Sequence, residues 1–310
     1  MKHPASASSP GSSACIIAAH GRHFRIRLDD GSLHAARPAR RDVQPVCGDR
    51  VRCELDQLHG EYRIVAIETR RTRLARTDSR GASELLAANV TLMLTVAAPQ
   101  PLADFFIIDR YLAGAACAGM RAAVVLNKQD LGISADTLDE LAAYRRTGYT
   151  VLSCSSRDLA SLQPLQDLLR DETAILVGQS GVGKSSLLKA LIPGSDAQVG
   201  ALDRSDEGRH TTVASRLYEL AAHAALIDSP GVRDFAPAIA DLEPSTLGFI
   251  DVAQLAPRCR FPDCRHLAEP DCAVRLAAGS DTLSARRYES YRRMRRLYER
   301  LQPPPGGRRR

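Results

Sequence analysis

Thr173-Ala-Ile-Leu-Val177 runs directly into Gly178-Gln-Ser-Gly-Val-Gly-Lys184-Ser185, and Ser185 opens the segment that ends at Ile192. The first run is short, apolar and partly β-branched, which predicts a buried strand, whereas Ser185 to Ile192 has the apolar spacing of a helix. Two glycines with four residues between them, followed by Lys and Ser, are typical of a loop that wraps phosphates. Strand, loop and helix together predict an α/β fold with a phosphate-binding site.

The predicted loop supplies the groups that phosphates require. Its glycines let backbone N–H groups approach the phosphates, and the N-terminus of the following helix favours their negative charge. Lys184 is expected to reach the β- and γ-phosphates, and the hydroxyl of Ser185 to bind Mg²⁺. The residues expected to contact the nucleotide here are Gly178, Gln179, Ser180, Gly181, Val182, Gly183, Lys184, Ser185 and Ser186.

A second motif, Asn127-Lys-Gln-Asp130, lies upstream of the loop and follows the apolar run Ala122–Leu126. The run predicts another buried strand, so the motif falls at the carboxyl end of a strand, where α/β sheets bind ligands. The carboxylate of Asp130 can accept hydrogen bonds from the N1–H and N2–H donors of guanine, a pair that adenine lacks. We therefore expect GTP to be bound and ATP rejected, with Asn127 and Lys128 bracing the loop and lying along the base.

Two segments downstream of the phosphate loop are expected to respond to the nucleotide. A predicted strand ends in Asp228-Ser-Pro-Gly231, where Asp228 is expected to hold Mg²⁺ through water and the N–H of Gly231 to sense the γ-phosphate. The polar segment Gly208-Arg-His-Thr-Thr212 offers a further hydroxyl for Mg²⁺. Thr211 and Thr212 are both candidates, and the sequence does not choose between them.

The order of these motifs is the reverse of that in ordinary GTPases, where the phosphate loop comes first and Asn-Lys-x-Asp follows much later. Between the two motifs, Thr150-Val-Leu-Ser153-Cys-Ser155 predicts a strand running into small residues, of which we expect Ser153 to support the guanine. A circular permutation can keep the same sheet, because strand neighbours depend on spatial order and domain termini usually lie close together. The chain therefore predicts a circularly permuted P-loop GTPase domain.

A cluster of possible metal ligands follows the last of these motifs. Cys259, Cys264, His266 and Cys272 lie within fourteen residues and can close a tetrahedral zinc site. Since all four positions would be filled by protein, we expect one structural zinc. The remaining cysteines are scattered singly and indicate no disulfide framework, and no signal peptide or membrane-spanning run is visible. A reducing, cytoplasmic location and no membrane partner are therefore expected.

The N-terminal region has the pattern of a small β-barrel. Phe24–Leu28, Asp49–Cys53 and Tyr62–Ile67 alternate apolar and polar residues and are separated by Gly-containing turns. This pattern predicts an antiparallel barrel, most plausibly the five-stranded OB type that binds oligonucleotides. Because aromatic residues are few here, backbone contact with folded RNA is favoured over stacking on single strands.

Charge is distributed unevenly over the 310 residues. Residues 15–80 hold 14 arginines against 9 acidic residues, and residues 286–310 hold 10 against 2, so two basic ends flank an acidic middle. That distribution is expected of a protein that grips nucleic acid from both sides, although an arginine-rich helix such as 284–301 is often only a solvated face. We expect a disordered segment at 1–14, an OB barrel at 15–76, the GTPase domain at 82–238, a zinc-binding domain at 239–301 and a disordered basic tail at 302–310.

Two other classes of function remain to be distinguished from a GTPase. A P-loop ATPase or kinase is disfavoured by Asp130. A GTP-sensing RNA-binding module would bind the nucleotide without significant turnover.

Together, these motifs resemble the ribosome small-subunit-dependent GTPase A family, also called RsgA or YjeQ. The likeness runs from about residue 15 to 301. It rests on the two nucleotide motifs, on the spacing Cys-x4-Cys-x-His-x5-Cys and on three short elements, Gly48-Asp-Arg-Val51, Gly208-Arg-His-Thr-Thr212 and Asp228-Ser-Pro-Gly-Val-Arg233. The resemblance implies slow hydrolysis of GTP to GDP, stimulated by the small (30S) ribosomal subunit, and a role in late maturation of that subunit in contact with 16S rRNA. A monomer is expected.

The chain departs from common GTPase patterns at three positions. Val213 stands where the family usually has a third threonine, and Gly181 where some potassium-activated GTPases carry Asn. Val232 follows Gly231 where many GTPases place the glutamine that orients the attacking water, so intrinsic turnover should be slow. Among Lys184, Thr212 and His210, the residues expected to serve catalysis, His210 is the candidate for positioning that water.

Overall fold

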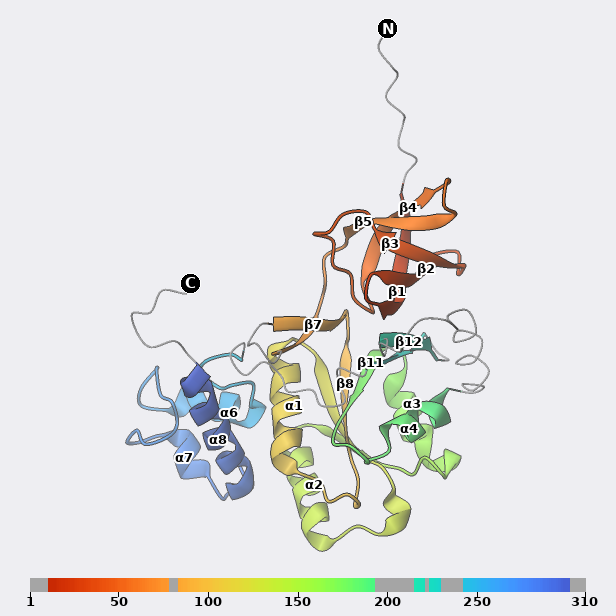
Figure 1. Ribbon diagram of the computed structural model, residues 1–310. Helices are drawn as coiled ribbons and strands as arrows, with labels where there is room; N and C mark the ends of the chain where they lie inside the picture. Colours follow the sequence, from red (N-terminus) through yellow and green to blue (C-terminus); the bar gives the residue numbers. More distant parts are fainter. Residues whose placement is uncertain (1–10, 78–82, 193–214, 221–222, 230–241, 302–310) are drawn as a thin grey trace.

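The computed structural model describes residues 11–77, 83–192, 215–220, 223–229 and 242–301. Within these ranges the chain forms an N-terminal barrel, a central sheet covered by helices, and a helical C-terminal region (Figure 1). The mixed α/β class, the barrel and the Cys/His cluster predicted from the sequence are confirmed.

Five strands close the N-terminal barrel. They are β1 (Ser12–His20), β2 (His23–Leu28), β3 (Leu33–Pro38), β4 (Arg50–Asp56) and β5 (Glu61–Ile67). β1 pairs with both β2 and β4, and β5 joins β3 to β4, so no barrel edge remains open. Alternate residues point inward, among them the fully buried Ile16, Ile26 and Ile64.

Two details of the barrel differ from the sequence-based expectation. β3 and β5 run parallel rather than antiparallel, because β4 turns back to pair with β1 and leaves the free edge of β3 to β5. β1 also begins at Ser12, inside the segment 1–14 predicted to be disordered. Ser12, Ser13 and Ala14 pair with β4, so backbone pairing in the barrel orders residues whose composition alone favours disorder.

The central sheet places the nucleotide motifs side by side. Its parallel strands lie in the order β10 (Thr150–Ser153), β9 (Arg121–Leu126), β8 (Leu92–Ala97), β11 (Thr173–Val177) and β13 (Ala225–Asp228). β12 (Ser215–Glu219) runs antiparallel beside β13. β8 is buried along its whole length and β11 over most of it, as expected for strands covered on both faces.

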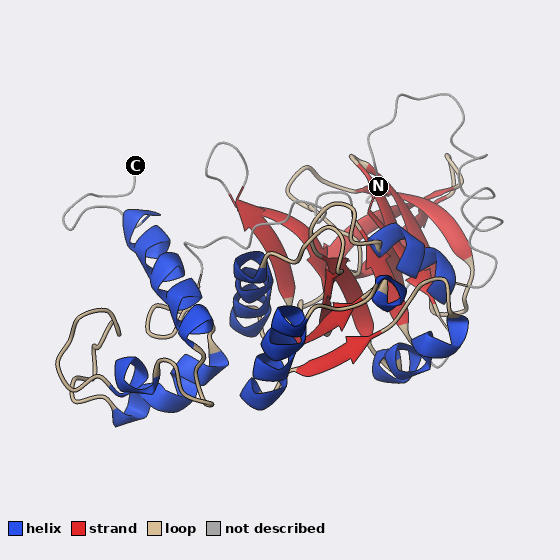
Figure 2. Cartoon of the chain, turned by 90° about the horizontal axis from the view of Figure 1, so that it is seen from below, coloured by secondary structure: helices blue, strands red, loops and turns tan. Residues whose placement is uncertain are grey.

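Helices cover both faces of this sheet (Figure 2). α1 (Phe105–Cys117) and α2 (Ala135–Thr147) pack on one face, and α3 (Gln163–Leu169) and α4 (Lys184–Leu191) on the other. The two short 3₁₀ helices η1 (Gln129–Leu131) and η2 (Leu159–Leu162) follow β9 and β10. The carboxyl ends of β9, β10 and β11 therefore meet at one edge, where ligands bind in such sheets.

The barrel joins the central sheet by strand pairing. β1 lies antiparallel beside β12, with Ala18 opposite Arg216 and Ala19 opposite Ser215, so the sheet continues into the barrel. Arg27 of β2 forms an ion pair with Glu219 of β12. A separate hairpin, β6 (Arg73–Thr77) with β7 (Ser83–Ala88), connects the two regions, and the proposed domain boundary at 76–82 runs through it.

The C-terminal region contains α6 (Ile250–Leu255), the 3₁₀ helix η5 (Ala256–Arg258), α7 (Ala273–Ala277) and α8 (Ala285–Leu301). Its core gathers apolar residues of all three α-helices around Tyr291 and Met294 of α8. Leu301, the last residue of α8, is 57% exposed. None of the helices that the structure describes has both the length and the apolar character needed to span a bilayer.

Candidate nucleotide site and metal centre

The phosphate loop joins β11 to α4 as predicted. At two of its positions, steric contacts leave room only for glycine. At Gly178 the backbone has φ +143°, and a Cβ atom would lie 2.2 Å from the carbonyl oxygen of Val96. At Gly183 φ is +95°, and a Cβ atom would lie 2.3 Å from Nδ2 of Asn127. Both positions therefore exclude larger residues, and the second one brings the two sequence motifs into direct contact.

Lys184 is the first residue of α4, and its side chain folds back over the phosphate loop. Its Nζ donates hydrogen bonds to the carbonyl oxygens of Gly178 at 2.6 Å and Gln179 at 2.7 Å. The ammonium group thus lies beside the backbone that would cradle a β-phosphate, close to the helix N-terminus. Ser180, Ser185 and Ser186 are exposed at the same edge, where their hydroxyls are accessible to a ligand.

Asn127 and Lys128 directly follow β9, which β8 separates from the phosphate-loop strand β11, and their side chains hold the phosphate loop. Nδ2 of the fully buried Asn127 donates to the carbonyl oxygen of Val182 at 3.0 Å, while its Oδ1 accepts from the N–H of Ser156. Nζ of Lys128 bridges the carbonyl oxygens of Gln100 at 2.8 Å and Gly181 at 2.7 Å. These contacts connect the base-reading motif to the phosphate loop, so the two halves of the site are held in one geometry.

Asp130 stands at the exposed end of this motif. Its Oδ1 accepts a hydrogen bond from Oγ of Ser155 at 2.6 Å, and Arg157 lies 4.0 Å from its Oδ2. The Ser155 hydrogen bond is the main cause that lowers the pKa of the Asp130 carboxyl below its ordinary value, so the group is ionised at neutral pH. An ionised carboxylate has acceptor positions left for the two donors of guanine.

The hydroxyl that donates to Asp130 belongs to Ser155, a residue of the same segment in which Ser153 was expected to support the guanine. Ser153 is the last residue of β10 and is half-buried, whereas Ser155 lies two residues beyond the strand and is 2% exposed. Pairing with β9 continues past Ser153, because the N–H of Cys154 donates to the carbonyl oxygen of Leu126. Residues two apart share one face of a strand, so Ser155 reaches Asp130 because it lies further along the chain, beyond the end of β10.

Replacing Ser155 with alanine is expected to weaken GTP binding about tenfold, since a hydrogen bond to a charged group contributes about 1.5–3 kcal/mol and water can replace part of it. Fluorescence titration with a labelled guanine nucleotide would measure the change. Ser156→Ala is the matched control, because only the backbone N–H of Ser156 is used. Equal affinities for the two variants would contradict the orienting role of Ser155.

Other predicted nucleotide contacts are described only in part. Asp228 ends β13 beside the phosphate-loop strand β11, and the following Ser229 is buried and accepts a hydrogen bond from the hydroxyl of Ser215 at 2.8 Å. The position of Asp228 is thus compatible with the predicted magnesium role. The remaining candidates His210, Thr211, Thr212 and Gly231 lie outside the described residues.

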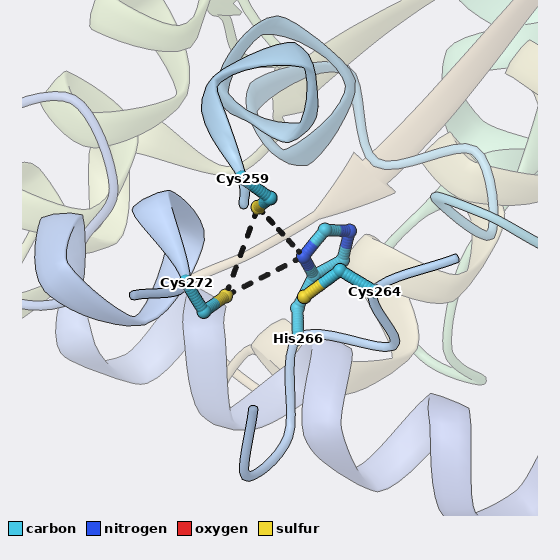
Figure 3. A group of neighbouring side chains, drawn as sticks. All are labelled: Cys259, Cys264, His266 and Cys272. Atoms are coloured by element: carbon cyan, nitrogen blue, oxygen red, sulfur yellow. Dashed lines mark hydrogen bonds between the residues drawn. The ribbon is translucent and has the colours of Figure 1, made fainter. Parts of the chain in front are cut away.

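The four predicted metal ligands come together in the C-terminal region (Figure 3). Sγ of Cys259 lies 3.4 Å from Nδ1 of His266 and 3.9 Å from Sγ of Cys272, and Sγ of Cys272 lies 3.5 Å from the same Nδ1. Ligand atoms of all four residues, including Cys264, lie within 4.8 Å of one another. Tetrahedral zinc, bound at about 2.3 Å from sulfur and 2.0–2.1 Å from nitrogen, requires ligand separations of about 3.6–3.8 Å. The cluster therefore fits a metal ion of this type.

The surroundings of the cluster favour metal binding by His266. The imidazole is 2% exposed, and burial, followed by the charge of Arg295, lowers its pKa, so the neutral form that binds metals is preferred. The hydroxyls of Tyr288 and Tyr291 donate to the carbonyl oxygens of His266 and Arg265. Helix α8 thus fixes the loop that carries the ligands.

Sequence reasoning missed a buried ionic cluster that joins α8 to the helices α1, α2 and α6. Arg287, 1% exposed, donates from Nη1 to Oδ1 of Asp109 at 2.6 Å and from Nε to Oδ2 of Asp251. Burial would lower the pKa of Arg287, but the charges of Asp109 and Asp251 outweigh this effect and raise it. Arg286 adds hydrogen bonds to Oδ2 of Asp109 at 2.7 Å and to Glu140 at 2.5 Å.

This cluster corrects part of the interpretation of the basic C-terminal end. Arg286, Arg287 and Arg295 are engaged within the protein, the last of them donating to the carbonyl oxygens of Pro244 and Ser245. They are not available for contact with nucleic acid. Arg293 and Arg296 of the same helix are exposed.

Comparison with known proteins gives a consistent result. The RsgA GTPase family model matches residues 67–237. Over 291 residues the chain is 40% identical to the small ribosomal subunit biogenesis GTPase RsgA of Azotobacter vinelandii, covering 91% of this chain and 84% of that protein. It is 37% identical to the protein of the same name from Nitrosomonas europaea, covering 90% of this chain and 89% of the relative.

Solved structures share the fold. The crystal structure of YjeQ from Thermotoga maritima superimposes with a TM-score of 0.74 at 23% identity and covers 94% of this chain and 99% of that one. YloQ, a circularly permuted GTPase, gives a TM-score of 0.73 at 25% identity and covers 97% and 99% of the two chains. The permuted strand order described above is thus that of a known class of GTPase.

Proposed function

This chain belongs to the RsgA GTPase family and is a GTP-hydrolysing enzyme of ribosome biogenesis, and from this premise we propose that it binds the small (30S) ribosomal subunit late in maturation and hydrolyses GTP there with subunit-stimulated turnover. The observation that carries the proposal is the joining of two motifs into one site: Asn127 and Lys128 hold the phosphate loop, while Asp130 presents an ionised carboxylate to a base. Such a site recognises a guanine nucleotide. The names of the relatives supply the ribosomal context.

Within the proposed reaction, protein groups position the nucleotide. Lys184 and the backbone N–H groups of the phosphate loop bind the β- and γ-phosphates. Ser185, Asp228 and one of Thr211 and Thr212 would hold Mg²⁺, which supplies charge neutralisation at the phosphates when bound. His210 is proposed to orient the attacking water, and the N–H of Gly231 to sense the γ-phosphate. Val232 offers no hydrogen bond for that water, which is consistent with slow turnover before the subunit is bound.

The barrel is one proposed contact with 16S rRNA, and the C-terminal region is the other. Its outer surface carries exposed arginines on different strands and turns, including Arg22, Arg41, Arg52 and Arg63. Guanidinium groups at such positions suit the phosphate backbone of folded RNA, which is bound largely by charge and shape. The proposal places the protein in the cytoplasm, acting as a monomer.

The experiment that tests the proposed function measures GTP hydrolysis with and without purified small ribosomal subunits, with ATP in parallel. We expect GTP-selective turnover that subunits stimulate many-fold, and at least a roughly 100-fold lower kcat for Lys184→Ala, as is typical on loss of a group that stabilises transition-state charge. GTP binding without turnover in the presence of subunits would instead favour a GTP-sensing RNA-binding module. Equal use of ATP and GTP would contradict the role of Asp130.

The Cys/His cluster is proposed to hold one structural zinc. Because burial raises the pKa of the Cys264 thiol to about 12 in the metal-free protein, the metal must displace a proton from it, and acid should release the metal. We expect one equivalent of zinc in the purified protein by elemental analysis, and its loss in Cys264→Ser. Cys53→Ser, at a buried barrel cysteine, should keep the metal. Full zinc content in Cys264→Ser would contradict the assignment.

A further inference from the structure

Helix α1 is connected at its beginning to the phosphate loop. Oε1 of Gln179, the second residue of the loop, accepts a hydrogen bond of 2.9 Å from the backbone N–H of Asp104. The carboxylate of Asp104 in turn caps α1 by accepting from the N–H groups of Phe106 and Ile107. The side chain of Gln179 is thus hydrogen-bonded to the start of α1. If the start of α1 shifts, either this hydrogen bond breaks or the phosphate loop moves with the helix.

A second connection reinforces the first. The segment leading into α1 contains Gln100 and Pro101, and Nζ of Lys128 joins the carbonyl oxygen of Gln100 to that of Gly181. The ring of Pro101 lies directly beside Gly181, since a Cβ atom at Gly181 would be 3.5 Å from Cδ of the proline. Residues 100–104 are therefore held against the phosphate loop by several contacts.

The first turns of α1 are also where the C-terminal region is attached. Arg286 of α8 stacks on the ring of Phe105 at 5.1 Å and binds Asp109, and Arg293 lies 4.0 Å from the ring centre of Phe106. Asp109 is only five residues beyond Asp104, or about 7.5 Å along the helix axis. One short, rigid piece of helix thus contacts the phosphate loop at one end and the metal-bearing region along its side.

We propose that Gln179 is a positioning residue through which the seating of the C-terminal region on α1 sets the geometry of the phosphate loop. This inference rests on the proposed function, because a subunit bound to the C-terminal region would act on GTP hydrolysis by this route. Gln179 does so by holding the loop to Asp104, while Arg286 and Asp109 hold α1 to α8. Loosening either attachment lets the loop relax independently of the C-terminal region.

A double-mutant cycle tests the connection. GTP turnover of the full chain is measured, with and without small ribosomal subunits, for wild type, Gln179→Ala, Arg286→Met and the double variant. Each single variant is expected to lower the fold-stimulation by subunits about tenfold, within the 5–150-fold range of typical coupling between sites. The double variant should be no worse than the more affected single variant, because both changes break the same connection. KM and kcat are determined separately, and thermal unfolding establishes that each variant is folded.

Matched control substitutions are available at an exposed glutamine and an exposed arginine. Gln163→Ala, at an exposed glutamine bonded to Asp167 on α3, and Arg296→Met, at an exposed arginine on α8, should both behave like wild type. Additive effects of Gln179→Ala and Arg286→Met, or full stimulation of Gln179→Ala, would overturn the inference. If wild type itself is not stimulated, the proposed function fails, whereas the inference is still tested by the same non-additivity in the basal KM for GTP.

Discussion

Replacement of Arg287 by alanine is expected to lower the free energy of unfolding by about 3–5 kcal/mol, the cost of breaking a buried ion pair from one side. Asp251 would lose its guanidinium partner and Asp109 would keep only that of Arg286, although both carboxylates are 1% exposed. The side chain also stacks on the rings of Tyr144 and Phe249, contacts that alanine cannot replace. Denaturant unfolding of the full chain, followed by circular dichroism, measures the change.

Arg296→Ala is the matched control for Arg287→Ala. Arg296 lies on the same helix and is exposed, so its loss should change the unfolding free energy by no more than about 0.5 kcal/mol. A similarly small change for Arg287→Ala would mean that the two carboxylates find other partners. In Arg287→Met the apolar stem is kept, and the loss that remains in this variant measures the missing charge.

The sites that the sequence predicts well are those whose residues are close together in the chain. Strand, loop and helix around Lys184 form one continuous segment, and the four metal ligands fall within fourteen residues. Asp130 is distant from the phosphate loop in the sequence, but its motif directly follows an apolar run that is recognisable as a buried strand. In each case local spacing carries the chemistry, so one sequence suffices.

Contacts between distant segments could not be predicted in this way. Arg287 and Asp109 are 178 residues apart, and an arginine in an arginine-rich helix has the same local pattern whether it faces solvent or a buried carboxylate. The pairing of β1 with β12 likewise joins two distant segments: Ala18 and Ala19 lie beyond the part of β1 that pairs with β4, and a sequence does not show which strand will pair there. Ser153 and Ser155 both lie in the predicted segment Thr150–Ser155. Only the structure shows that strand pairing continues to Cys154 and that the hydroxyl of Ser155 donates to Asp130.

Replacement of Asp130 by asparagine is expected to weaken GTP binding by about 10³-fold or more and to favour xanthosine triphosphate. A carboxylate accepts from both N1–H and N2–H of guanine, whereas the amide of asparagine presents one acceptor and one donor. The donor would face the guanine amino group, leaving polar groups unpaired, and sites built on such hydrogen bonds discriminate by about 10⁴–10⁵-fold. Xanthine, with an N–H donor beside a carbonyl acceptor, matches the amide. Competition titrations with the two triphosphates measure the change in preference.

The Asp130→Asn exchange isolates base recognition from phosphate binding, because asparagine is nearly the same size and can still accept the hydrogen bond of Ser155. Inorganic triphosphate should therefore bind both proteins equally, which is the control. The Ser155 hydrogen bond keeps the pKa of the Asp130 carboxyl below its ordinary value, so wild-type preference for GTP should persist into mildly acidic solution and disappear only as the pH falls through that lowered pKa. The asparagine variant has no such titration. If both proteins lost GTP equally on acidification, or if the variant kept its preference for GTP, Asp130 would not be the group that reads the base.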